Sequence, residues 1–100
     1  MRLEFFEDAA SEIEEDRAWY RERSESAEAG FLREIDHAVQ QVTDAPAQWP
    51  QYLAGTRRYV FPTYPYSLVY FVEDAVIWVV AVAPDKKRPG YWRKRLRKGR

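Results

Sequence analysis

The chain has 100 residues, 46% of them hydrophobic and 16% aromatic, so it can bury a domain core and is too apolar for a disordered protein. It has no cysteine, which excludes a disulfide framework and a thiolate metal site. The formal net charge is zero, so any charge-driven interaction depends on where the charges lie.

The first residues turn acidic after Phe6, unlike a secretory signal. The longest apolar run, residues 75–84, is about half as long as a membrane span requires. We therefore expect one soluble, cytoplasmic domain over residues 1–100, with a basic tail over residues 84–100 and no membrane partner.

The N-terminal half predicts one strand and two helices. Residues 2–6 alternate as a short strand with Leu3 and Phe5 on one face. Asp8 is a candidate N-cap for a helix to about residue 25, whose apolar stripe is thin. A second helix, from about 27 to 45, carries a clear apolar stripe that includes Phe31 and Ile35. The short joint between the helices predicts an α-hairpin.

The C-terminal half predicts three strands, at residues 57–61, 66–72 and 75–83, after a loop rich in proline. The last two are almost continuously apolar and are joined by a tight turn, so we expect them in the middle of the sheet. The order β-α-α-β-β-β indicates an α+β fold, in which the helical hairpin covers one face of an antiparallel sheet.

The charges are segregated along the chain. Residues 1–50 hold thirteen acidic and five basic side chains, a net charge of −8, and residues 51–100 hold three acidic and eleven basic ones, a net charge of +8. Nine of those eleven cations lie between Lys86 and Arg100, with no acid among them. Such a tail suits an acidic or polyanionic partner, although acidic helices could also simply attract it from a distance.

Most catalytic chemistry is excluded by what the sequence lacks. With one histidine, His37, and no cysteine, the usual zinc clusters cannot form, and the four glycines are isolated, so there is no phosphate-binding glycine loop. We therefore expect no metal and no cofactor.

The remaining reactive side chains are basic residues and tyrosine. If strands 57–61 and 75–83 are neighbours, their cations converge with Tyr91 on a surface suited to phosphate. In the alternative, Pro89 and Gly90 form a turn that folds Tyr91 and Trp92 back onto the sheet. The candidate cluster consists of Arg57, Arg58, Lys86, Lys87, Arg88 and Tyr91.

The order of several segments resembles a known family. These are "FLREID" in the second helix, "FPTYPYSLVYFVEDAVIWVVAVA" through the last two strands, and "RPGYWRKR" in the tail. Over essentially the whole chain the pattern resembles the RelE/ParE superfamily of type II toxin–antitoxin toxins, also called plasmid stabilisation proteins. The resemblance implies a bacterial growth inhibitor that a cognate antitoxin neutralises.

Two mechanisms occur in that superfamily. RelE-like toxins are ribosome-dependent endonucleases that cut mRNA without metal; such a site would use the six-residue cluster, and its cations could lower the pKa of Tyr91 to make it a base. Where those toxins usually carry an arginine this chain has Ser67, and where many relatives with the same ending carry a histidine it has Pro84.

These departures bring the chain closer to ParE-like toxins, which bind DNA gyrase. A third possibility is a relative that has lost its toxicity. A target- or RNA-binding surface would comprise Arg57, Arg58, Lys86, Lys87, Arg88, Tyr91, Arg93, Lys94 and Arg95. The antitoxin is expected to bind, through an acidic or amphipathic segment, to apolar side chains that would otherwise be exposed: Leu3, Phe5, Phe31 and Ile35.

Overall fold

The computed structural model describes residues 1–98, so the last two residues of the predicted tail lie outside it. The elements follow the order β-α-α-β-β-β, with a short helix added at the C-terminal end. Their bounds are β1 Arg2–Phe5, α1 Glu7–Arg23, α2 Glu25–Asp44, the 3-10 turn η1 Leu53–Gly55, β2 Arg57–Val60, β3 Tyr66–Glu73, β4 Val76–Pro84 and α3 Arg93–Lys98.

The four strands form one sheet in the order β1-β4-β3-β2, so the two most apolar strands are central, as predicted. β2 pairs with β3 and β3 with β4 in antiparallel fashion, whereas β1 lies parallel to β4. The α+β class is confirmed, but the expectation of a purely antiparallel sheet is wrong. The direction of β1 is set by the helical hairpin that follows it, and residues within the strand do not reveal it.

A single residue, Ser24, connects α1 to α2 in the helical hairpin. The Ser24 hydroxyl accepts a hydrogen bond from the backbone N–H of Ala27 and so caps α2. The predicted cap of α1 is wrong: Phe6 is the N-cap residue and Asp8 lies in the first turn. The negative charge of Asp8 in that turn still stabilises the helix, because the N-terminal end of a helix carries a partial positive charge.

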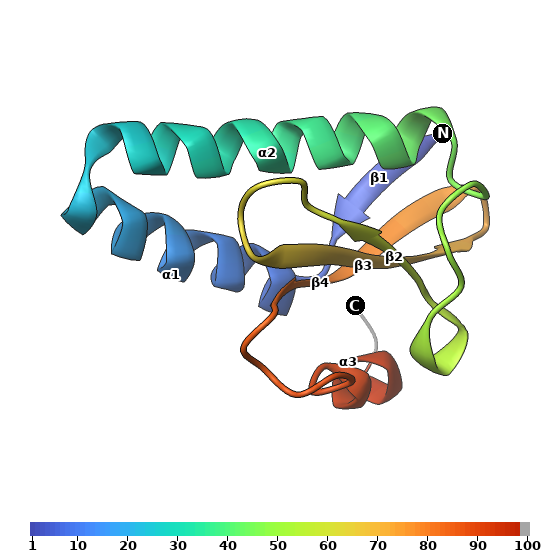
Figure 1. Ribbon diagram of the computed structural model, residues 1–100. Helices are drawn as coiled ribbons and strands as arrows, with labels where there is room; N and C mark the ends of the chain where they lie inside the picture. The colour runs from blue at the N-terminus through green and yellow to red at the C-terminus, as the bar shows by residue number, and fades with distance from the viewer. Residues whose placement is uncertain (99–100) are drawn as a thin grey trace.

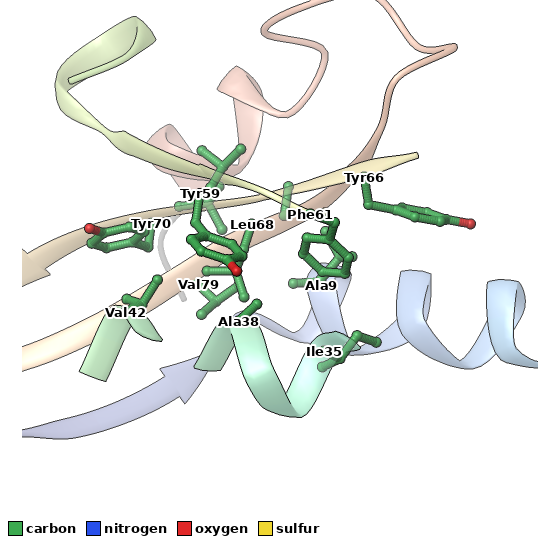
Figure 2. Close-up of a cluster of buried hydrophobic side chains, with 14 of the residues drawn as sticks. Ala9, Ile35, Ala38, Val42, Tyr59, Phe61, Tyr66, Leu68, Tyr70 and Val79 are labelled. Carbon is green, nitrogen blue, oxygen red and sulfur yellow. The ribbon is translucent and has the colours of Figure 1, made fainter. Parts of the chain in front are cut away.

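The core lies between α2 and one face of the sheet. Figure 2 shows side chains of β2, β3 and β4, among them Tyr59, Leu68 and Val79, directed toward Ala38 and Val42 of α2. In Figure 1, α2 lies on one side of the sheet and α3 on the other. The sheet is therefore covered by the hairpin on one face and by the C-terminal segment on part of the opposite face.

Candidate functional site

The basic tail is folded onto the sheet. Gly90 has φ 82°, a left-handed conformation that glycine adopts without strain, and it turns the chain toward α3. Trp92 follows and is only 1% exposed, with its ring centroid 6.2 Å from that of Tyr52. The predicted turn at Pro89 and Gly90 and the fold-back of Trp92 are confirmed. The helix α3 that comes next was not predicted.

A buried carboxylate joins the tail to the first helix. Glu12 of α1 is 8% exposed, and its two oxygens each accept one hydrogen bond from the Arg95 guanidinium, both at 2.9 Å. The Tyr91 hydroxyl and the Val82 backbone N–H also donate to Glu12. Arg95 further donates to the Val80 carbonyl at 2.9 Å. We call Glu12, Tyr91 and Arg95 the tail anchor.

The tail anchor changes the acid–base properties of its members. Burial raises the pKa of the Tyr91 phenol, and the hydrogen bond to Glu12 raises it further. For Arg95, burial lowers the pKa, but the bonds to Glu12 outweigh it and hold the guanidinium charged. Arg95 does lower the pKa of Tyr91, but burial and Glu12 outweigh it, so the expectation that the cations leave Tyr91 with a lowered pKa is wrong. The acidic helix also contacts the tail directly, which corrects the expectation that they attract only at a distance.

A pocket of about 200 Å³ lies between β2 and the segment that leads from β4 to α3. Arg58 lines it from β2, and Lys87 and Arg88 line it from the segment after β4. Tyr91 and Ser67 also contribute to its wall. We call this the cationic pocket. It unites four of the six residues of the predicted cluster.

The other two residues of that cluster lie elsewhere, because β3 separates β2 from β4. Arg57 donates a hydrogen bond to the Trp49 carbonyl at 2.7 Å and lines a different hollow. Lys86 lines a neighbouring hollow of about 180 Å³ with Asp16 and Trp19. The assumption that β2 and β4 are adjacent is wrong. Arg58, Lys87 and Arg88 instead meet beside the N-terminal end of β3, where Ser67 lies.

The remaining predicted target-binding residues lie on α3. Arg93 and Lys94 are exposed, as are Arg97 and Lys98, which were not assigned before. Arg95 points inward to the tail anchor and is mostly buried. We call the four exposed residues the α3 surface.

The predicted antitoxin-binding residues divide into two groups. Leu3 and Phe5 on β1 are half-buried, on an outer strand of the sheet. Phe31 and Ile35 are 0% and 6% exposed, within the core. The expectation that these two would form an exposed patch is therefore wrong, because the stripe of α2 that contains them packs on the sheet.

Sequence reasoning missed Glu12 and Tyr52. Glu12 stands in the acidic run "EIEED" and lies three residues after the buried Ala9, which places it on the inner side of α1. This three-residue spacing from Ala9 is the pattern from which the inward position of Glu12 could have been predicted. Tyr52 lies in the irregular loop before β2, where no periodicity predicts a side-chain direction.

Within residues 1–98, no group of three or more His, Asp or Glu side chains is placed to hold a metal ion. None of the helices described there is long and apolar enough to cross a membrane.

One comparison with known proteins identifies a family, and a second shows a similar fold. The family model described as "ParE toxin of type II toxin-antitoxin system, parDE" matches residues 3–97. Among solved structures, "Chromosomal ParDE TA system from P. aeruginosa" is similar, with a TM-score of 0.73 and 18% identity, covering 84% of this chain and 95% of that chain. No curated protein matches. Because the family model spans nearly the whole sequence, the chain belongs to the ParE toxin family of type II toxin–antitoxin systems.

Proposed function

We propose that this toxin binds DNA gyrase through its basic C-terminal end and does not cleave RNA. The hydrogen bond from the Tyr91 hydroxyl to Glu12 carries the proposal. A nuclease that uses the RNA 2′-hydroxyl as nucleophile needs a group that accepts its proton. The Tyr91 hydroxyl already donates a hydrogen bond to a carboxylate, and its raised pKa keeps it protonated near neutral pH, so it is not available to accept a proton.

No histidine lies in the cationic pocket to serve as the base in place of Tyr91. The only histidine of the chain, His37, lines a different hollow together with Glu34 and Thr63. Pro84, which stands where many relatives with the same ending are expected to carry a histidine, lies on the wall of the cationic pocket itself. The pocket therefore holds cations that would stabilise a charged phosphate but no imidazole.

The α3 surface is a suitable contact for a nucleic-acid enzyme or its bound DNA. Its four cations are exposed on a short helix that the buried Trp92 and the tail anchor hold in place. Fixed cations on one surface attract a negatively charged partner over a longer range than scattered ones do, and they do so without a reaction step.

The proposal is tested by supercoiling with purified gyrase and purified toxin. We expect inhibition by the native protein and by Tyr91→Phe, and weaker inhibition by the double variant Lys94→Gln/Arg97→Gln. The matched control Arg2→Gln/Arg33→Gln removes two exposed cations from the N-terminal half and should inhibit like the native toxin. Equal loss in both double variants would show that only net charge matters and would reject the α3 surface.

Pulse labelling in bacteria separates the possible targets. Within minutes of induction, we expect thymidine uptake to fall while methionine uptake continues. An early fall in methionine uptake that Tyr91→Ala abolishes would instead support an mRNA endonuclease. Growth without any arrest would indicate a relative that has lost its toxicity.

A cognate antitoxin is the partner that the family implies. We place its contact at the outer edge of β1, where Leu3 and Phe5 are half-buried and no further strand of residues 1–98 pairs. Leu3→Glu should weaken capture of the cognate antitoxin, whereas Val72→Glu, at a side chain already 45% exposed, should not. Equal capture by both variants would move the contact elsewhere.

A further inference from the structure

We propose that the cationic pocket binds a phosphate group, carried by a nucleotide or by a nucleic-acid chain. The proposal concerns a place in the fold distinct from the α3 surface: the pocket is lined by β2, the end of β3 and the segment after β4, and none of the four α3-surface residues lines it. It does not depend on whether gyrase is the target.

The pocket has an excess of unpaired positive charge. Among residues 1–98, none of the three cations Arg58, Lys87 and Arg88 has a carboxylate within 4.0 Å. Asp85 is the one acidic residue of the lining, so three positive charges and one negative leave a net charge of +2. A phosphate monoester carries about −1.5 to −2 at neutral pH, which matches that excess better than a single carboxylate does.

Two of the cations are oriented by aromatic rings. The guanidinium carbon of Arg58 lies 4.2 Å from the ring centroid of Tyr52, and the Lys87 ammonium lies 4.8 Å from that of Tyr91. Stacking of this kind restricts a side chain but leaves its N–H donors free. Within the described chain, the Arg58 guanidinium donates to no side chain or carbonyl, so its donors are available to a ligand.

The wall that faces these cations contains hydrogen-bonded and buried side chains. Tyr91 is fixed by its bond to Glu12, and Trp92 beside it is fully buried. Ser67 is 5% exposed and lines the pocket, where its hydroxyl can donate to a phosphate oxygen. A preorganised set of donors loses little entropy when a ligand binds, which favours affinity.

The size of the pocket suits a phosphate group with part of its ester. A phosphate with part of an attached sugar fits a volume of about 200 Å³. A carboxylate side chain of an acidic protein segment is small enough to enter as well, so it is the net charge of +2 that favours a phosphate.

The test uses the full chain, labelled with ¹⁵N, and adenosine 5′-monophosphate as the probe. We expect saturable shifts at Arg58, Ser67 and Lys87, and none with adenosine, which lacks the phosphate. Arg58→Gln and Arg88→Gln should each weaken binding about tenfold, as loss of a charge-assisted hydrogen bond would. The control Arg97→Gln removes one exposed cation outside the pocket and should change affinity less than about twofold.

Arg88 is exposed, so its variant tests the site even if Arg58→Gln fails to fold. A short single-stranded RNA that binds more tightly than the nucleotide, with the same dependence on Arg58 and Arg88, would assign the phosphate to a nucleic-acid chain; equal affinity would assign it to a free nucleotide. The proposal is overturned by the absence of saturation at concentrations on the order of 10 mM, by equal weakening in Arg97→Gln, or by equally tight binding of tetraglutamate.

Discussion

Glu12 shows how one carboxylate connects distant parts of this toxin. It meets Arg95, 83 residues further along the chain, and no local pattern predicts such a pair. Burying an ion pair removes both charges from water, which is tolerable only when every oxygen and N–H is hydrogen-bonded. Here the carboxylate accepts bonds from Tyr91, Val82 and Arg95, and within the described residues no buried side-chain polar atom lacks a partner.

We predict that Glu12→Gln lowers the free energy of unfolding by about 3 kcal/mol. The amide is uncharged and presents an N–H₂ donor where Tyr91 and Arg95 also donate, so the Arg95 charge keeps only the more distant Asp8 carboxylate, at 3.6 Å, as a counter-charge. Urea unfolding followed by tryptophan fluorescence measures the change. The control Glu15→Gln, at an exposed position of the same helix, should change it by less than about 0.5 kcal/mol. A similar loss in both variants would mean that the ion pair contributes nothing specific.

At the scale of elements, the sequence predicts what is decided locally. The stripe of α2 and the apolar runs of β3 and β4 are patterns within one element, and the structure confirms all three. The parallel pairing of β1 and the joining of Arg58 to Lys87 in one pocket depend on which strands become neighbours. The helix α3 has only six residues, most of them cations, so burial of Trp92 just before it stabilises it more than its own sequence does.

The helical hairpin carries a pH-dependent contact. Glu28 of α2 accepts hydrogen bonds from Arg21 at 2.7 Å and Arg17 at 2.8 Å, both on α1. The bonds from Arg21, then those from Arg17, lower the pKa of Glu28 from 4.5 to about 2. A carboxyl with a lowered folded-state pKa binds protons more readily in the unfolded chain. Its stabilising effect is therefore complete above about pH 4.5 and is lost as the pH falls through about 2.

We therefore predict that native toxin and Glu28→Gln differ in unfolding free energy at neutral pH and converge near pH 2. Urea titrations of both proteins across that range measure the difference, and the other carboxyl groups cancel because both proteins contain them. Asp36→Asn, at an exposed position of α2, is the control and should show no such convergence. A gap between native and Glu28→Gln that stays constant with pH would show that the contact does not depend on charge.

For the whole molecule, folding leaves most basic side chains of the described tail without a carboxylate partner. Of the eight Lys and Arg residues between positions 86 and 98, only Arg95 has a carboxylate of the described chain within 4.0 Å. In Figure 1 the α1–α2 joint lies at one end of the molecule, and α3 lies below the sheet. Asp8 and Glu12 of the acidic first helix pair with Arg95, and the exposed cations of the α3 surface remain available to a partner.

Electrostatic attraction of this kind acts mainly on the rate of association. For the acidic antitoxin segment proposed from the charge of the tail, we predict that the association rate with the toxin falls at least about tenfold as salt is raised to about 1 M, while the dissociation rate changes much less. Lys94→Glu should lower the rate at low salt and flatten its salt dependence, whereas Arg33→Glu, an exposed site on α2, should leave both nearly unchanged. Stopped-flow mixing over a salt series measures these rates. If Arg33→Glu slowed association as much as Lys94→Glu, net charge would govern the encounter, and the position of the cations on α3 would not.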